Sequence, residues 1–403
     1  DGDVENAHFK NFEFTADVKT ELAANSGIYF HTEFQDEDWP AKGYEAQIKN
    51  THRPGSGYIE RKLTGSLYGI RNTYKSPVQD NEWFNYHIKV QGKTIHIRIN
   101  GYLVCDYTEA DDPWRPDNMP GRRLSSGTFA LQCHDPDSRV YFKNIRVKPL
   151  PDHLPSIGKP LDDTELDKKL TLLAATNFPL MDLHVHLKGG LTLEAAQASS
   201  RRYGITHGYA INCGQSFPIS SDEQLADSLA NYVRLPHTFL AMQAEGREWM
   251  DLFSREGRNR FDYVFTDAMT WSNKNGKRMR LWIKEETEVG DVQDFMEQLV
   301  SQIEKILATE PIDIYVNPTF LPDEIAASYD ELWTTERMDR VITALKKNNI
   351  ALEINARRNI PSPAFIKRAK AAGIKFTFGT NNSGKDDLGH LTYCLAMIDE
   401  CGL

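Results

Sequence analysis

Two histidines separated by a single residue occur in the apolar run MDLHVHLKGG, residues 181–190. Residues i and i+2 of a β-strand point to the same face, so His184 and His186 are expected side by side. Imidazole nitrogens are good ligands for divalent metals such as Zn²⁺. The spacing therefore favours a metal site if other segments supply further ligands.

Polar side chains also end the other apolar runs of the C-terminal part. These runs are GITHGYAINCG, TFLAMQAEG, FDYVFTDAM, IDIYVNPTF, IALEINAR and KFTFGTNN. The polar residues at or near their ends are Asn212, Glu245, Asp267, Asn317, Glu353, Asn355 and Asn381. Carboxylates in this set are metal ligands, whereas a neutral amide oxygen binds Zn²⁺ or Mn²⁺ weakly.

The residue types leave two kinds of site open. The first is a single divalent metal, Zn, Mn or Ca, on four ligands: His184, His186, Glu245 and Asp267. The second is a metal-free pocket whose amides hydrogen-bond a polar ligand such as a sugar: Asn317, Asn355 and Asn381.

A second group of candidate residues lies in the N-terminal part, on the runs SGIYFHTEF, GYEAQIKN and FALQCHD. Alternation places their polar side chains on one face of a sheet: Tyr29, His31, Glu45, Gln47, Gln132 and His134. Amides and imidazoles suit sugar hydroxyls, and a carboxylate adds a titratable group. Glu45 is the first candidate base and His134 the second.

The order of the apolar runs predicts the elements that position these residues. Short alternating runs fill residues 1–149, and Ile95, Ile97 and Ile99 point to one face. Asn100-Gly101 predicts a two-residue hairpin. We therefore expect an all-β antiparallel sandwich over 1–149.

The rest of the chain has a different texture. Residues 148–163, KPLPDHLPSIGKPLDD, are rich in proline, and a linker is predicted over 150–175. Seven apolar runs then alternate with helical spacing, which predicts a distorted (β/α)7 barrel over 176–403. In such barrels the site lies at the C-terminal ends of the strands.

Composition excludes several classes of protein. The 403 residues carry a net charge of -10, which argues against nucleic acid as a partner. No apolar stretch approaches the ~20 residues of a membrane span. There is no glycine-rich phosphate loop, so no nucleotide cofactor is expected, and no GxSxG elbow of a serine hydrolase. The five cysteines form no CxxC pair.

The N-terminal part resembles a known family. NSGIYFHTEF, GYEAQIKN, TGSLYGI, NEWFNYHIKVQGKTIHIRINGYLV and YFKNIRVKP, taken in order over residues 8–149, are similar to the 3-keto-disaccharide hydrolase family, which has a concanavalin-like jelly-roll fold. Two positions depart from it. His31 stands where the family more often has arginine, and Asn50 where aspartate is common.

The resemblance implies chemistry on glycosides already oxidised at C3. A C3 ketone acidifies the proton on C2, so a base can form an enolate that expels the aglycone from C1, and water then adds. The base needs a suitable pKa and the enolate oxygen needs an electrophile. The candidates for stabilising that oxygen are His31, Gln47 or a divalent cation.

The C-terminal part resembles the polymerase and histidinol phosphatase (PHP) superfamily over most of residues 177–403. DLHVHLKGG matches the metal-binding HxH of that barrel, and Glu245 in AEG matches an acidic ligand. Asn317, Asn381 and Ser383 stand where the superfamily has histidine or aspartate, and Met269 replaces a histidine. The motif set is thus partly kept, which disfavours a cluster of two or three metals.

Three hypotheses cover the whole chain. The preferred one is a bacterial carbohydrate-processing enzyme in which the sandwich cleaves 3-keto-glycosides. The others are a PHP-like metal-dependent hydrolase with a sugar-binding sandwich, and a non-catalytic carbohydrate-binding protein. By analogy with such families, and because the chain begins at Asp1, we expect a periplasmic or cell-surface location after removal of a signal peptide.

Overall fold

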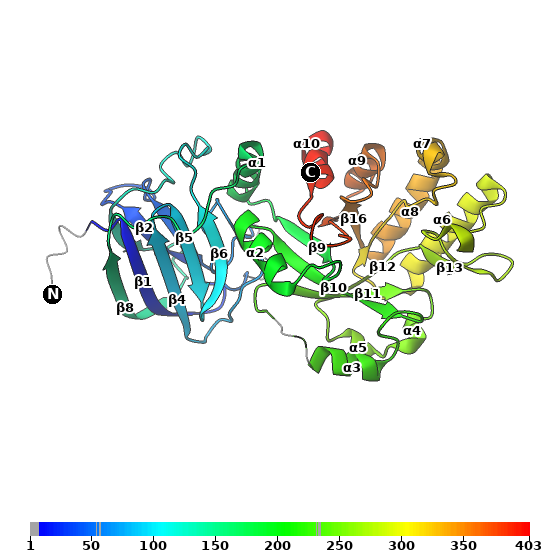
Figure 1. Cartoon of the computed structure of the whole chain (residues 1–403), viewed down its shortest axis with the longest axis horizontal. Coiled ribbons are helices and arrows are strands. Elements are labelled where there is room, and N and C mark those ends of the chain that lie inside the picture. The colour runs from blue at the N-terminus through cyan, green and yellow to red at the C-terminus, as the bar shows by residue number, and fades with distance from the viewer. Residues whose placement is uncertain (1–7, 54, 56–57, 231, 233–234) are drawn as a thin grey trace. The chain divides into compact units, whose positions relative to one another are not determined.

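The chain divides into two compact units (Figure 1). The structure is a computed structural model that describes residues 8–53, 55, 58–230, 232 and 235–403. Unit 1 comprises Asp1–Met181, Glu194–Thr206 and Leu235–Thr238, and unit 2 comprises Asp182–Leu193, His207–Arg234 and Phe239–Leu403. None of the helices in the described part of the chain has the length and apolar character of a membrane span.

Unit 1 contains a β-sandwich, as predicted. A five-stranded sheet has the order β6-β5-β4-β1-β8 and a three-stranded sheet the order β3-β2-β7, and all their pairings are antiparallel. The strands are β1 (Asn11–Thr20), β2 (Ser26–Thr32), β3 (Tyr44–Ile48), β4 (Phe84–Gln91), β5 (Thr94–Ile99), β6 (Tyr102–Thr108), β7 (Thr128–Leu131) and β8 (Val140–Leu150).

Alternating apolar residues fill the space between the two sheets. Ile95, Ile97 and Ile99 of β5 are fully buried and belong to one core cluster with Ile28 and Phe30 of β2. Removing this apolar surface from water is the main force that holds the two sheets together. The polar residues that alternate with these isoleucines along β5 therefore face away from the core.

The predicted hairpin between β5 and β6 is confirmed. Asn100 and Gly101 are the two residues between the strands, with φ of 50° and 82°. A two-residue turn of this kind needs positive φ at both positions, which asparagine and glycine tolerate best.

Unit 2 contains a closed barrel in which seven strands follow the order β10-β11-β12-β15-β16-β17-β9, with parallel pairing. The strands are β9 (Met181–Val185), β10 (Thr206–Gly214), β11 (Phe239–Glu245), β12 (Tyr263–Thr266), β15 (Ile314–Tyr315), β16 (Ala351–Asn355) and β17 (Phe376–Gly379). Each lies in one of the seven predicted runs, so the predicted barrel is confirmed. A short hairpin, β13 (Thr270–Ser272) with β14 (Arg278–Arg280), was not predicted.

Helices cover the outside of the barrel. Helices α6, α8, α9 and α10 pack each against the next, and Phe295, Leu299 and Leu345 from α6 and α8 share a core cluster with Met242 and Leu352 of the strands. The helices of unit 2 are α3 (Asp222–Ala230), α4 (Trp249–Leu252), α5 (Arg255–Arg258), α6 (Val292–Thr309), α7 (Tyr329–Leu332), α8 (Thr335–Asn348), α9 (Pro363–Ala371) and α10 (Thr392–Cys401), with 3-10 turns η2 (Lys284–Glu286) and η3 (Ala326–Ser328). Helix α2 (Leu193–Tyr203) belongs almost entirely to unit 1.

The segment expected as a linker, 150–175, is only partly irregular. Residues 151–163 lack helix and strand, but α1 (Thr164–Ala175) follows. The Asp163 side chain caps this helix by accepting a hydrogen bond from the Leu166 N–H at 2.9 Å. Leu170 and Leu173 are buried, so α1 packs as part of a folded unit instead of forming a spacer.

Candidate functional site: a polar pocket on the sandwich and a buried polar network in the barrel

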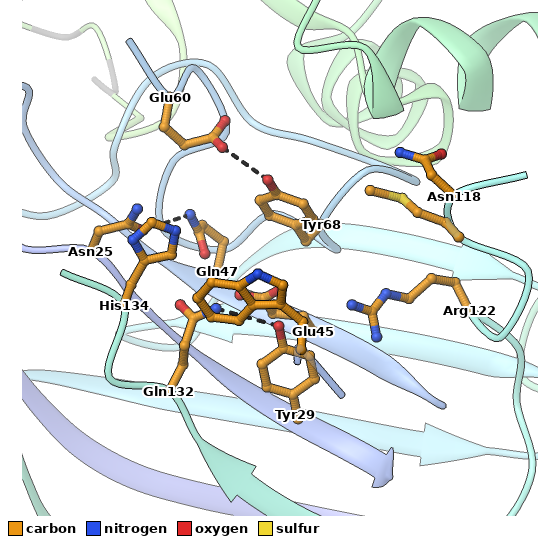
Figure 2. Close-up of a pocket in the computed structure, with 12 residues that line it drawn as sticks. Asn25, Tyr29, Glu45, Gln47, Glu60, Tyr68, Asn118, Arg122, Gln132 and His134 are labelled. Atoms are coloured by element: carbon orange, nitrogen blue, oxygen red, sulfur yellow. Dashed lines mark hydrogen bonds between the residues drawn. The ribbon is translucent and has the colours of Figure 1, made fainter. Parts of the chain in front are cut away.

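A pocket of about 280 Å³ opens on the three-stranded sheet of the sandwich (Figure 2). The predicted residues Tyr29, Glu45, Gln47, Gln132 and His134 all line it. The remaining lining residues are Asn25, Trp39, Glu60, Tyr68, Asn118, Met119 and Arg122.

The ladder between β2 and β3 positions the carboxylate of this pocket. Tyr29 pairs with Glu45, and Gly27 pairs with Gln47. A Cβ at Gly27 would lie 2.4 Å from Glu45 Oε1, which is too close for any side chain. Glycine at position 27 therefore makes the room that Glu45 occupies.

Glu45 is a buried carboxylate of the pocket, with 3% of its surface exposed. Burial raises the pKa of Glu45 above its ordinary value, while the hydrogen bond from Tyr29 and the charge of Arg122 act in the opposite direction. A carboxylate with a raised pKa is a stronger base than an exposed one. Its place in a polar pocket therefore suits proton abstraction.

Two amide oxygens in the pocket have no partner among the described residues: Gln47 Oε1 and Gln132 Oε1. The amide nitrogens are both used, because Gln47 Nε2 donates to Asn25 Oδ1 at 3.1 Å and Gln132 Nε2 donates to Tyr29 Oη at 3.3 Å. Buried acceptors almost always have a donor in native proteins. A ligand with hydroxyl groups would supply the missing donors.

His134 lies at the edge of the pocket and is partly exposed. Its Nδ1 is 2.6 Å from Asp135 Oδ1, and its ring stacks on that of Trp39 with centroids 5.1 Å apart. The carboxylate fixes one ring nitrogen, so the other is free to exchange a proton with a ligand.

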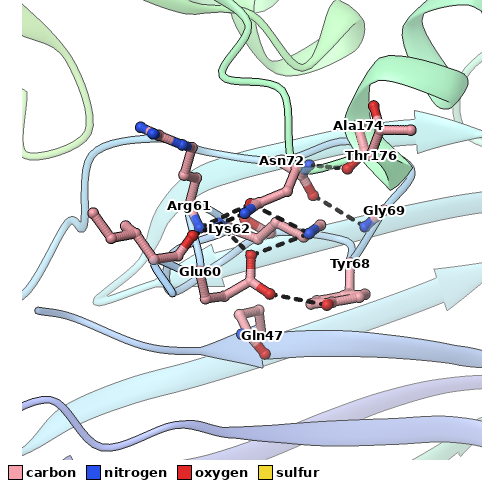
Figure 3. A network of polar contacts seen from close by, with 12 residues as sticks. Gln47, Glu60, Arg61, Lys62, Tyr68, Gly69, Asn72, Ala174 and Thr176 are labelled. Carbon is pink, nitrogen blue, oxygen red and sulfur yellow. Dashed lines mark hydrogen bonds and ion pairs between the residues drawn. The ribbon is translucent and has the colours of Figure 1, made fainter. Parts of the chain in front are cut away.

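Glu60 is a second carboxylate of the pocket, and it is held very differently from Glu45 (Figure 3). Its Oε2 accepts hydrogen bonds from Tyr58 at 3.0 Å and Tyr68 at 2.9 Å, and its Oε1 accepts from the backbone N–H of Lys62 at 3.0 Å and from Lys62 Nζ at 3.1 Å. Burial alone would raise the pKa of Glu60, but Lys62 and these hydrogen bonds lower it below its ordinary value.

The two carboxylates of the pocket are therefore suited to different tasks. The oxygens of Glu60 are occupied by four hydrogen bonds, and its ionised form is stabilised. Glu45 is desolvated and its pKa is raised. Opposite pKa shifts on neighbouring groups separate a structural anion from a working base. The sequence did not identify Glu60 as a site residue, because the described part of residues 49–66 forms neither helix nor strand and so has no periodicity to interpret.

His31 does not take the predicted place beside Tyr29. The β2–β7 register shifts between Phe30 and Thr32, and His31 has a φ of 55°. Such a bulge breaks the alternation of side chains. His31 is buried, with Nε2 2.8 Å from the Lys10 carbonyl oxygen and Nδ1 3.2 Å from the Ser125 backbone nitrogen. It is not among the residues lining the pocket.

Arg122 supplies the positive charge on this side of the pocket. Its guanidinium carbon lies 5.2 Å from the centre of the Tyr29 ring, and Nη1 donates to the Pro40 carbonyl at 2.8 Å. In Figure 2 the guanidinium points towards Glu45. Arg122 could be recognised only from the structure, because its segment lies between β6 and β7 with no periodicity.

In the barrel, His184 is held between two acceptors. Its Nδ1 is 2.6 Å from Glu353 Oε1, and its Nε2 is 3.2 Å from Gln243 Oε1. The orientation of the Gln243 amide is fixed by Nε2, which donates to Glu245 at 2.9 Å. Both ring nitrogens of His184 thus lie within hydrogen-bonding distance of a side-chain oxygen.

The two predicted carboxylate ligands are also engaged. Glu245 accepts from Asn212 Nδ2 at 2.9 Å, and Asp267 accepts from Asn317 Nδ2 at 2.8 Å. Burial raises the pKa of both acids, and the charge of Asp267 raises that of Glu245 further, to about 8.

The three amides predicted to bind a ligand mostly bond one another. Asn355 Nδ2 and Asn381 Nδ2 both donate to Asn317 Oδ1 at 3.0 Å. Asn355 Nδ2 also donates to Glu353 Oε2 at 2.9 Å. All three residues are buried. Asn317 and Asn355 therefore donate hydrogen bonds to buried carboxylates of the barrel, and Asn381 donates to Asn317.

His184, Glu245 and Asp267, three of the four residues of the predicted single-metal site, hydrogen-bond other side chains. His184, His186, Glu245 and Asp267 are each near the strand ends, but within the described ranges no three His, Cys, Asp or Glu side chains gather as a metal site. Burial and then the charge of His184 lower the pKa of His186 well below its ordinary value. Gln243 donates to Glu245, Asn317 to Asp267 and Asn355 to Glu353.

The comparisons with known proteins assign the N-terminal part. Residues 4–148 match the model of the 3-keto-alpha-glucoside-1,2-lyase-like domain. This part of the chain therefore matches the family that the sequence resemblance implied. No curated protein matches the chain.

Several solved structures are similar to parts of the chain. A protein of Parabacteroides distasonis, provisionally described as a glycosyl hydrolase, is 28% identical with a TM-score of 0.30, over 36% of this chain and 80% of that one. The carbohydrate-binding module CBM66 of Bacillus subtilis is 16% identical with a TM-score of 0.25, over 36% and 78%. Histidinol phosphate phosphatase of Lactococcus lactis, solved with zinc, L-histidinol and phosphate, is 13% identical with a TM-score of 0.41, over 56% and 94%.

Proposed function

We propose that the sandwich domain cleaves 3-keto-glycosides and that Glu45 is the base that removes the proton from C2. The observation that carries this proposal is the burial of Glu45 in a polar pocket, which raises its pKa. The family match over residues 4–148 supports the substrate class. The unpartnered oxygens of Gln47 and Gln132 support binding of hydroxyl groups.

The reaction proceeds by elimination and then addition of water. Glu45 takes the C2 proton, the electron pair of that C–H bond forms the enolate of the C3 ketone, and the positive charge of Arg122 stabilises the enolate oxygen. Collapse of the enolate breaks the bond from C1 to the glycosidic oxygen. His134 donates a proton to that departing oxygen. Water then adds its hydroxyl to C1 and gives its other proton to His134, while C2 takes a proton from Glu45 that has exchanged with solvent, which completes a net hydrolysis and restores both groups.

Glycosidase chemistry with two carboxylates is disfavoured. That mechanism needs one acid and one nucleophile or base across the scissile bond. The pocket has a second carboxylate in Glu60, but four hydrogen bonds from Tyr58, Tyr68 and Lys62 occupy its oxygens. Glu60 then acts as an anchor for the Tyr68 ring at the pocket wall.

Sugar binding without turnover is the second candidate. The unpartnered oxygens of Gln47 and Gln132 favour it, since they would hold hydroxyl groups whether or not a base acts. A metal-dependent hydrolase in the barrel is less favoured, because both ring nitrogens of His184 face acceptors. The periplasmic or cell-surface location stays a proposal, tested by fractionating cells that express the full-length precursor.

Turnover of a 3-keto-α-glucoside by purified variants tests the proposal. Glu45→Gln keeps the shape of the side chain, so it should bind the substrate while kcat falls by about 10²–10⁴-fold, the usual contribution of a general base. His184→Ala, provided that it folds, is expected to leave the reaction intact. If Glu45→Gln keeps full activity and His184→Ala loses it, the reaction would take place in the barrel. If the wild type binds the substrate saturably but does not turn it over, the function of the sandwich would be sugar binding without catalysis.

A further inference from the structure

A cavity of about 570 Å³ lies in unit 2, among the segments that follow β15 and β16. Its walls include Phe320, Tyr329, Arg357, Arg358 and Tyr393. A volume of this size suits a small-molecule ligand. None of its lining residues lines the sandwich pocket, so the cavity is independent of the proposed 3-keto-glycoside site.

Arg358 is held with its guanidinium in this cavity. Its guanidinium carbon lies 4.3 Å from the centre of the Phe320 ring, and its backbone N–H donates to Asn355 Oδ1 at 3.0 Å. The stacked ring fixes the plane of the guanidinium and leaves its edge available. The buried Nε has no hydrogen-bond partner within the described part of the chain. A buried donor without an acceptor indicates a missing partner.

Arg357 adds a second guanidinium directly beside the first. Its side chain is exposed, and Nη1 makes one long contact of 3.4 Å with the Asn381 carbonyl oxygen. Across the described ranges, no carboxylate forms an ion pair with Arg357 or Arg358. Burial, and then the charge of Arg357, lower the pKa of Arg358. Two cations held together in this way gain stability when an anion binds between them.

The other walls suit the body of a polar ligand. Tyr329 and Tyr393 present aromatic surface, and the carboxylates of Asp323 and Asp330 are exposed at the cavity. Carboxylates accept hydrogen bonds from hydroxyl groups, and aromatic rings pack on the apolar faces of sugars. The cavity therefore offers donors for an oxyanion on one side and acceptors for hydroxyl groups on the other.

We propose that this cavity binds a small hydroxylated molecule through an oxyanion, either a phosphate or a carboxylate, which Arg357 and Arg358 hold together. The planar guanidinium of Arg358 matches the paired oxygens of such a group. Asp323 and Asp330 accept hydroxyl protons from the rest of the ligand.

Calorimetric titration of the full chain tests the proposal, with glucose 6-phosphate, glucuronate, inorganic phosphate and glucose as the ligands. Saturable binding of at least one anion, with no binding of glucose in the same cavity, is expected. Arg358→Gln should weaken that binding by about tenfold or more, the loss expected for a charge-assisted hydrogen bond. A preference for the phosphate or for glucuronate tells which oxyanion the cavity accepts.

Matched variants keep the test specific. Arg255→Gln in α5 removes the same charge outside the cavity, so it should leave the anion affinity unchanged. Arg357→Gln alters an exposed side chain and provides a second test if Arg358→Gln does not fold. The proposal is overturned if no anion binds the wild type saturably, or if the arginine variants and Arg255→Gln bind equally well. If glucose binds, and Glu45→Gln changes this binding while Arg358→Gln leaves it unchanged, then the glucose binds in the sandwich pocket.

Discussion

Tyr29 lies directly opposite Glu45 in the β2–β3 ladder, and its hydroxyl hydrogen-bonds the carboxylate that we propose as the base. That hydrogen bond lowers the pKa of Glu45, whereas burial raises it. Tyr29, the cross-strand neighbour of Glu45, therefore affects the pKa of the proposed base.

The pH dependence of the reaction should reveal this control. The base acts in its ionised form, so kcat/KM should rise with pH through the pKa of Glu45, at a pH above the ordinary glutamate value of about 4.3. Tyr29→Phe removes the hydrogen bond that favours the ionised form. The acid limb of its pH profile should therefore lie at higher pH than in the wild type. An unchanged limb in Tyr29→Phe would mean that another group titrates.

Gly27→Ala should damage catalysis with little effect on the fold. The new Cβ would meet Glu45 Oε1 at 2.4 Å, so the carboxylate must move. We expect a fall in kcat of about tenfold or more, since misplacement of a catalytic group by an ångström has large effects.

The matched control for that prediction shortens the base. Glu45→Asp withdraws the carboxylate by one methylene, so adding Gly27→Ala to Glu45→Asp should cost less than it does in the wild type. Steady-state kinetics of the four proteins measures this coupling. Equal losses in both backgrounds would show that Gly27 acts on something other than Glu45.

The ion pair of Glu60 and Lys62 should be essential for stability. Both side chains are almost fully buried, with 5% and 2% exposed. Lys62→Met leaves the Glu60 carboxylate buried without its cation, which typically costs about 3–5 kcal/mol. Urea unfolding at neutral pH measures the loss. The pKa of Glu60 is lowered in the folded state, so its stabilisation is present above the unfolded pKa and lost as pH falls through the folded one.

A control separates the charge from the packing of Lys62. In Lys62→Met with Glu60→Gln no buried charge is left unpaired, so much of the stability should return. If the double variant is as unstable as Lys62→Met, loss of the contact of Lys62 Nζ with the Tyr68 ring, whose centre is 4.6 Å away, would explain the result instead.

Chelation should leave the barrel unchanged. Each ring nitrogen of His184 has a side-chain oxygen within hydrogen-bonding distance, from Glu353 or Gln243, so we expect the fold to form without a metal at this position. We expect substoichiometric zinc and manganese by elemental analysis of dialysed protein, and the same Tm with and without EDTA. One retained equivalent of metal per chain, together with a lower Tm in EDTA, would show that a cation replaces these hydrogen bonds.

Much of the fold could be predicted from hydrophobic periodicity. The seven barrel runs and the Asn100-Gly101 turn were recognisable because alternation and turn residues are local signals. The same alternation brought Tyr29, Glu45 and Gln47 to one face. It failed at His31, where a bulge with a φ of 55° turns the side chain away.

The rest depended on contacts between distant segments. Glu60 and Arg122 lie in segments without regular period, so only the folded chain shows them beside Glu45. The HxH spacing correctly located a barrel strand end. It could not show that Gln243 and Glu353 take up both nitrogens of His184, because those partners lie 59 and 169 residues away.

Exchange of the C2 hydrogen tests the central claim most directly. A 3-keto-glucoside incubated with the wild type in D₂O should be followed by NMR for loss of the C2 proton signal in the sugar product. Wild type should place deuterium at C2 at the rate of turnover, and Glu45→Gln should abolish both. Cleavage that leaves the C2 proton in place would contradict proton abstraction beside the ketone.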